Sequence, residues 1–355
     1  MLSRTADHLF WMARYTERAE NTARMLDANY QMSLLPQSDE YAEAGWRAML
    51  SISELTTFYA SVKSGMKSLD VIDFMSRERT NLSSIASCLH AARENARAVR
   101  GSTNTELWET INTTWLESQR MLADGVLERD PAEFFEWVKF RSHLSRGVQL
   151  GTMAKDEAFY FMRIGTFIER ADNTARILDV KFEMLEQGDD VPAESLDYYH
   201  WSAVLRSVSG FEVYRKTYRD VITPERVAAL LILNRDWPRS LAASMEEVQQ
   251  IVARVSRGRS VRAERLADRL SSELSDGSIR DILRGGLHAY LNEFLARVNE
   301  LASTISQDFL LPIAPEPEPA QSQTQTQSQG TGSQSQSQTP QSQTQSQSPS
   351  PSAAP

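Results

Sequence analysis

The chain has 355 residues and a net charge of −9, and it lacks a lysine-rich block, which argues against a nucleic-acid partner. Its single cysteine, Cys88, lies among apolar residues and excludes an intramolecular disulfide. The longest unbroken apolar run, seven residues at 227–233, is far shorter than the roughly 20 residues that span a bilayer, and the N-terminus lacks the apolar core of a secretory signal. We therefore expect a cytoplasmic protein with no membrane partner.

Helical periodicity dominates residues 1–311, where 13 glycines and 5 prolines are too few for a turn-rich β fold. Asp130 followed by Pro131 is typical of a cap and the first turn of a helix. In chain order, apolar spacing and capping residues predict helices at about residues 3–34, 39–62, 69–75, 81–100, 105–122, 131–147, 156–186, 195–218, 224–233, 240–256, 259–275 and 278–310. The sequence therefore predicts an all-α multi-helix bundle of about ten to twelve helices.

Residues 312–355 differ in composition from the rest of the chain. Proline and glutamate alternate at residues 315–319, and 27 of the 35 residues from 321 to 355 are Gln, Ser or Thr. Such a segment cannot bury enough apolar surface to offset its ordering entropy. We expect a helical domain at 1–311 and a disordered solubilising or tethering tail at 312–355.

One segment of the chain is repeated. Residues 17–27 and 169–179 are identical at nine of eleven positions, and 152 residues separate the two copies. A single long period of this kind is typical of a duplicated helical half, and it is too long for a solenoid. We expect two diverged halves packed around a pseudo-two-fold axis, with the repeat helices at about 4–34 and 156–186.

Polar side chains of the repeat fall in one sector of each helix, at about 100° per residue, whereas most of the remaining circumference is apolar. A narrow polar sector on an apolar helix predicts that it faces a partner or a cleft inside the molecule. We call these sectors the first polar stripe (Glu17, Glu20, Asn21 and Arg24) and the second polar stripe (Glu169, Asp172, Asn173 and Arg176).

Three interpretations of the stripes remain open. The i,i+4 pairs within them, such as Glu20 with Arg24, support a purely structural network that joins the two halves. The same groups could recognise a peptide or an amino acid. The i,i+3 carboxylates could instead hold a divalent cation such as Mg²⁺ or Mn²⁺, although no cofactor is required. Neither stripe contains the Glu-x-x-His pattern of a di-iron bundle.

Arginines form two weaker candidate sites for an anion: Arg93, Arg97 and Arg100 on one predicted helix, and Arg235 and Arg239 in the loop at 234–240. Guanidinium groups held on one face can bind a carboxylate or a phosphate. The alternative for the helix is a solvated basic face, and the alternative for the loop is a turn held by its own hydrogen bonds. The chain contains no Walker loop, no Gly-x-Ser-x-Gly, no His-Glu-x-x-His and no paired cysteines. These motifs therefore mark no catalytic residue.

Four segments in order, at residues 2–24, 92–101, 167–176 and 234–241, resemble the alpha-E family of bacterial all-helical proteins. The resemblance covers about residues 1–311 and leaves out the tail. It implies association with a circularly permuted ATP-grasp protein and a transglutaminase-like protein, in a system that modifies or makes peptides by forming amide bonds. Asp172 stands where the first copy has Glu20, which argues against a strictly symmetric site.

Two functions are compatible with these observations. The first is a helical partner that binds or presents a peptide substrate to an ATP-grasp ligase. The second is an enzyme whose paired carboxylates carry out acid/base or divalent-metal chemistry. The absence of a histidine in either stripe, and of a nucleophile with a neighbouring base, favours the first function.

Overall fold

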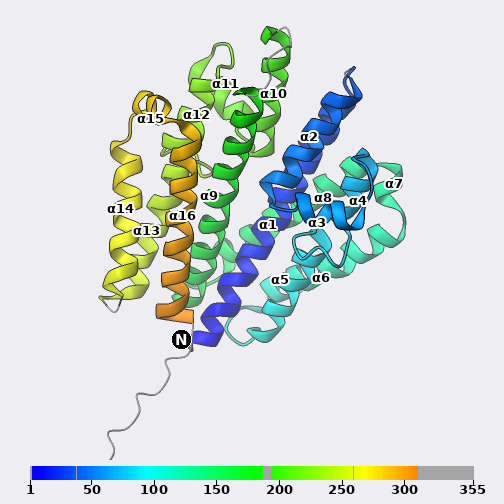
Figure 1. The fold of residues 1–355 in the computed structure, drawn as a ribbon. Coiled ribbons are helices and arrows are strands. Elements are labelled where there is room, and N and C mark those ends of the chain that lie inside the picture. Colours follow the sequence, from blue (N-terminus) through cyan, green and yellow to red (C-terminus); the bar gives the residue numbers. More distant parts are fainter. Residues whose placement is uncertain (1, 37, 187–192, 259, 311–355) are drawn as a thin grey trace, which may run out of the picture. The chain divides into compact units, whose positions relative to one another are not determined.

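The computed structural model describes residues 2–36, 38–186, 193–258 and 260–310, and within these residues it contains 16 α-helices, one π-helical turn and no strand (Figure 1). The prediction of an all-α fold is confirmed. The predicted tail at 312–355 lies outside the described residues. No helix in the described ranges combines the length and the apolar character that crossing a bilayer requires.

Eight helices of the described residues precede residue 157, and eight more begin at or after it. The first eight are α1 (Ser3–Ser33), α2 (Asp39–Ile52), α3 (Thr56–Val62), α4 (Ser68–Ser76), α5 (Ile85–Ala98), α6 (Thr105–Ala123), α7 (Val126–Arg129) and α8 (Pro131–Thr152). The others are α9 (Glu157–Glu186), α10 (Ala193–Ser207), α11 (Phe211–Tyr218), α12 (Pro224–Leu233), α13 (Leu241–Ser256), α14 (Val261–Asp276), α15 (Ile279–Gly285) and α16 (Leu287–Ile305), with the π-helical turn at Ser306–Leu310.

The number of helices exceeds the prediction because three predicted helices break and the short helix α7 is added. Residues 39–62 break at Glu54 and residues 195–218 at Ser209, which have left-handed φ angles of 56° and 58°. Residues 278–310 break at Gly286, where φ is 96°. Glutamate and serine do not mark left-handed positions in a sequence as glycine does. Apolar periodicity therefore predicted one continuous helix across each of the first two turns.

The second eight helices repeat the packing of the first eight. Helix α1 packs against α5 and α8, and α9 packs in the same way against α13 and α16. The second helix of each half crosses to the other half, since α2 contacts α9 and α10 contacts α1. In Figure 1, α5, α6 and α8 lie on one side of the α1–α9 pair, and α13, α14 and α16 lie on the other. The helical domain is therefore built from two diverged copies of one eight-helix unit.

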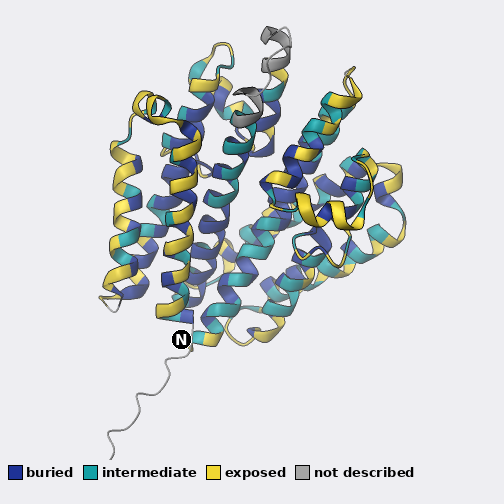
Figure 2. Cartoon of the chain, viewed as in Figure 1, coloured by how far each residue is buried: buried dark blue, intermediate teal, exposed yellow. Residues whose placement is uncertain are grey.

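Helices α1 and α9 form the largest helix–helix contact of the described residues, and they are mostly buried or half-buried (Figure 2). They approach closely at Gly165, where a Cβ atom would collide with the carbonyl oxygen of Phe10 and lie 3.4 Å from Cβ of Ala13. Ala13 and Gly165 are equivalent positions, 152 residues apart. Because equivalent residues meet at the crossing, the two polar stripes lie along one shared interface.

Candidate functional site

The two repeat helices exchange arginines. Arg170 of α9 donates from Nε to Oε1 and from Nη2 to Oε2 of Glu17, both at 3.0 Å. Arg18 of α1 donates through the same atoms to Glu169, at 2.5 and 3.1 Å. Arg18 and Arg170 are themselves equivalent positions of the repeat, and both carboxylates are buried. Each glutamate is thus bound by the arginine of the other copy, through two parallel hydrogen bonds.

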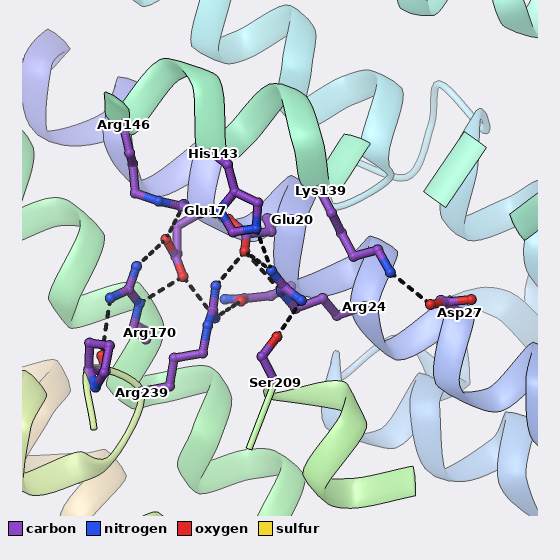
Figure 3. A network of polar contacts seen from close by, with 12 residues as sticks. Glu17, Glu20, Arg24, Asp27, Lys139, His143, Arg146, Arg170, Ser209 and Arg239 are labelled. Carbon is purple, nitrogen blue, oxygen red and sulfur yellow. Dashed lines mark hydrogen bonds and ion pairs between the residues drawn. The ribbon is translucent and has the colours of Figure 1, made fainter. Parts of the chain in front are cut away.

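The first polar stripe lies inside a buried ionic network, which we call the closed site (Figure 3). Arg146 of α8 and Arg239 of the loop before α13 bind Glu17 at 3.0 and 3.1 Å. Glu20 is bound by Arg239 at 2.5 Å and by Arg24 at 2.6 Å, and it also contacts Arg146. The closed site comprises two carboxylates and four guanidinium groups: Glu17, Glu20, Arg24, Arg146, Arg170 and Arg239.

Burial and charge oppose each other in the closed site. Burial raises the pKa of Glu17, but Arg170 and Arg239 outweigh it, so this pKa lies well below its usual range. The pKa of Glu20 is also lowered, because Arg239 and the other arginines outweigh burial and the repulsion from Glu17. Burial lowers the pKa of Arg239 to about 10, against the attraction of the two carboxylates. All these groups are charged at neutral pH, so the closed site carries an excess of positive charge.

Two exposed residues, His143 and Ser209, border the closed site (Figure 3). His143 of α8 lies between two arginines, with Nε2 at 3.1 Å from Nη2 of Arg24 and Nδ1 at 2.8 Å from Nη2 of Arg146. Burial lowers the pKa of His143, so the imidazole is neutral at pH 7 and can accept a hydrogen bond. Arg24 also donates to the hydroxyl of Ser209, the left-handed residue between α10 and α11.

The second polar stripe lines an open pocket of about 200 Å³, which we call the joint pocket. Residues from both repeat helices and from two turns of the first half form its wall: Arg18, Asn21, Thr22, Met25, Ile52, Ser53, Glu54, Ser83, Glu169, Asp172, Asn173 and Arg176. Arg176 binds Asp172 at 2.8 Å and also contacts Glu54. Burial raises the pKa of Asp172, and its hydrogen bonds from Arg176 only partly oppose this.

Asn21 connects the closed site with the joint pocket. Its Oδ1 accepts a hydrogen bond of 2.9 Å from Nη1 of Arg239. Its Nδ2 is buried and has no hydrogen-bond partner among the described residues. The residue is only 2% exposed, and it forms part of the pocket wall. A buried amide donor without a protein acceptor is destabilising, so an oxygen supplied by water or by a ligand would stabilise it.

The structure thus brings the eight predicted stripe residues together along one helix pair, but as two unequal sites. Sequence reasoning missed Arg18 and Arg170, although both belong to the repeated segment. The predicted polar sectors treated each helix by itself, whereas the side chains of Arg18 and Arg170 extend to the other helix. Arg146 and His143 lie outside the repeat on α8, where no motif marked them.

The weaker arginine candidates do not converge on one place in the described structure. Arg93 and Arg97 both donate to Glu94, and Arg100 lies exposed beyond the end of α5. Helix α5 ends too early to align all three. Arg235 pairs with Glu246, whereas Arg239 is buried in the closed site. Four of these five arginines are thus paired with acidic side chains, and the fifth, Arg100, is exposed to solvent.

A second cavity, of about 620 Å³, lies beside α5 and α6. His90 and Trp115 contribute to its wall, with their ring centroids 5.0 Å apart, and Arg77 and Arg79 add positive charge. The sequence carried no sign of this cavity, because its residues come from separate helices and a loop.

A family model, Alpha-E, described as a predicted alpha-helical domain with a conserved ER motif, matches residues 1–310. The chain belongs to the Alpha-E family. Uncharacterized proteins of Mycobacterium bovis and Mycobacterium tuberculosis are 24% identical to it over 322 residues, which is 83% of this chain. The match covers 35% of each of these proteins, so the chain spans about a third of the length of the curated relatives it matches. No solved structure matches the chain.

The exchange between α1 and α9 gives a physical reason for a Glu-Arg motif in this Alpha-E chain. Glu17–Arg18 and Glu169–Arg170 are neighbours in sequence, yet each residue of a pair binds a residue of the other pair. Two adjacent charged residues on each helix therefore form two buried ion pairs across the interface. The motif holds the two halves together at the position where both candidate sites begin.

Proposed function

We propose that this Alpha-E protein is a non-catalytic binding component that holds or presents a peptide substrate for an amide-bond-forming ATP-grasp ligase. The buried Asn21 amide, unpartnered in the wall of the joint pocket, is the observation that carries this proposal. It is a polar group prepared for a ligand, in a place where two rigid helices fix its position. The ligase and a transglutaminase-like protein are what the family resemblance implies, and the cytoplasmic location remains the expectation from the sequence.

The protonation states of the three buried glutamates argue against acid/base catalysis by these groups. A general acid or base works best with a pKa near the working pH. The pKa values of Glu17, Glu20 and Glu169 are all lowered, since arginines outweigh burial at each. Burial raises the pKa of the Cys88 thiol to about 12, so it does not supply a thiolate.

The neighbours of the carboxylates also argue against a divalent-metal enzyme, the second candidate. Glu17 and Glu20 are each bound by three guanidinium groups in the described structure. These arginines occupy the carboxylate oxygens and repel a dication. A metal at the first polar stripe would have to displace buried ion pairs, which is costly.

The mycobacterial relatives support a modular role. In those proteins the matching region is joined to additional sequence that makes up most of the chain. A helical module linked to a longer protein is suited to delivering a bound group to another active site.

Co-purification from the native host tests the proposal. Tagged wild-type protein should recover an ATP-grasp protein and a peptide, both identified by mass spectrometry. Asn21→Leu should keep the protein partner and lose the peptide, because it removes the amide that faces the ligand. Asn292→Leu is the matched control, since Asn292 is exposed on α16 and should behave as wild type. Recovery of neither molecule, or formation of amide bonds by the isolated protein, would overturn the proposal.

A further inference from the structure

The closed site and the joint pocket are equivalent places in the two halves. Arg24 contacts Ser209 in the first, and Arg176 contacts Glu54 in the second. Both contacted residues are left-handed, and both lie between the second and third helices of a half. The turns share a hydrogen-bond pattern as well, because the N–H groups of Leu55 and Gly210 each bond to the carbonyl five residues earlier, at 2.8 and 2.6 Å.

A second pair of turns shows which residue differs. Ser84 caps α5 and Ser240 caps α13, each accepting a hydrogen bond from the N–H three residues later. Each cap serine also donates its own N–H to the carbonyl three residues earlier, at 3.0 and 3.1 Å. The residue before the cap is Ser83 in the first half and Arg239 in the second. Ser83 therefore stands in the joint pocket where the closed site has a buried arginine.

The missing arginine leaves the joint pocket short of positive charge. Among the described side chains, Glu17 is bound by three guanidinium groups and its equivalent Glu169 by two. Glu20 is bound by three, whereas its equivalent Asp172 is bound by Arg176 alone. The pKa of Asp172 is raised by burial, whereas arginines lower that of Glu20. Asp172 also has one methylene fewer than Glu20, which leaves more space.

We infer that the joint pocket binds the guanidinium or ammonium group of an amino acid or peptide, in the place that Arg239 fills in the closed site. The cation would contact Glu169, Asp172 and Asn173, the equivalents of the three residues that hold Arg239. The net charge of −9 attracts such a ligand from solution. This inference rests on the proposed function and names the chemical class of its substrate.

Asn21 adds a second requirement for the ligand. Its Nδ2 needs an acceptor oxygen, which the cation itself does not supply. An amino acid or peptide provides a carbonyl or carboxylate oxygen within a few bonds of its cationic group. The pocket volume of about 200 Å³ is below the roughly 300–1,000 Å³ of drug-sized sites, so it accommodates about one residue.

Calorimetric titration of the full chain with three small probes tests this inference. N-acetyl-arginine methylamide carries a guanidinium, glycinamide carries an N-terminal ammonium, and N-acetyl-citrulline methylamide is the neutral isostere of the first. We expect saturable binding of at least one cationic probe, and binding of the citrulline probe at least about tenfold weaker, because an ionic hydrogen bond is lost. The better cationic probe identifies whether the side chain or the N-terminus of a peptide is bound.

Variants locate the binding in the joint pocket. Ser83→Arg should reproduce in the joint pocket the arrangement of the closed site. The new side chain should fill the pocket and abolish probe binding, without lowering the stability measured by urea unfolding. Asp172→Asn should weaken binding by about tenfold or more. Asp281→Asn, at an exposed position of α15, is the matched control and should bind as wild type. Ser83→Arg binding as wild type, equal affinity for the citrulline probe, or no saturable binding of a cation would overturn the inference.

The two proposals fail in different ways. If the pocket accepts a peptide that has no cation in it, the co-purified peptide is still lost in Asn21→Leu, but the citrulline and arginine probes bind alike. If the protein does not present peptides, the cationic probes still bind and respond to Ser83→Arg, but no peptide is recovered from the host.

Discussion

Arg18 and Arg170 each neutralise a glutamate that belongs to the other copy of the repeat. A buried ion pair contributes little net stability compared with apolar packing, but removing one partner leaves a stranded charge. In the closed site this applies to several charges at once, because Glu17 is shared by three arginines. The network therefore behaves as a unit, and single substitutions in it should be severe.

Replacing Glu17 by glutamine should destabilise the protein by about 3–5 kcal/mol, since two buried guanidinium groups and the half-buried Arg146 lose a charged partner. Urea unfolding followed by circular dichroism measures this. Glu109→Gln is the matched control, at an exposed position of α6, and should change the free energy of unfolding by less than about 0.5 kcal/mol. Equal effects of the two substitutions would show that the closed site does not stabilise the fold.

Arg24→Ala should destabilise more than Arg176→Ala. Arg24 is bound to Glu20, whose side chain is fully buried, so its removal should have an effect of about 3–5 kcal/mol. Arg176 pairs with the partly exposed Asp172 and with Glu54, whose side chain is 73% exposed, so water can replace it. Parallel urea titrations compare the two. A larger effect for Arg176 would contradict the assignment of one closed and one open site.

Stability should fall as the pH drops below about 4.5. The pKa values of Glu17, Glu20 and Glu169 are lowered from 4.5 in the folded state, so the folded state holds fewer protons than the unfolded state in this range. Their contribution is therefore complete above about 4.5 and is lost on acidification. Urea unfolding between pH 7 and pH 3 measures the loss. Glu17→Gln, which removes one of these groups, should show a shallower fall than wild type.

At the scale of elements, the α1–α9 crossing fixes the positions of both sites. Gly165 permits the two backbones to touch at equivalent points of the repeat. The stripes begin one turn beyond this contact, so their separation depends on it. A change in the crossing should therefore affect the ion pairs as well as the packing.

Gly165→Ala should destabilise by about 1–3 kcal/mol or more, because the new methyl group meets the carbonyl of Phe10 rather than a flexible side chain. Gly147→Ala is the matched control on α8, where no atom lies within 4 Å of the added Cβ, and it should stabilise by about 0.4–1 kcal/mol. Thermal unfolding of both variants measures the two changes in stability. A stabilising Gly165→Ala would mean that the helices are not in backbone contact.

The sequence was informative about elements and less so about contacts between them. Apolar periodicity located α1 and α9, and the repeat predicted that their polar stripes face each other. It could not predict the turns at Glu54 and Ser209, because their left-handed conformation depends on tertiary packing. It placed Arg239 in an anion site, although this arginine is buried against Glu17 and Glu20 of α1. Its hydrogen-bond partner on that helix, Asn21, is 218 residues away in sequence.

At the scale of the whole helical domain, duplication produced two copies of one site, and two differences made them unequal. Arg239 closes one copy and Ser83 leaves the other open, while Asp172 shortens one carboxylate. The closed site then helps to hold the two halves together, and the other copy, the joint pocket, stays open. This division explains why near-identical sequence motifs have different surroundings in the folded chain.

The side-chain amide signal of Asn21 in a ¹⁵N nuclear magnetic resonance spectrum tests the central claim most directly. Titration with the cationic probe that binds should shift this signal and slow its exchange with solvent, because Nδ2 gains an acceptor in the joint pocket. The signal should stay unchanged in Ser83→Arg under the same conditions. An Asn21 signal that does not respond at saturation, while signals elsewhere shift, would show that the ligand binds outside the joint pocket.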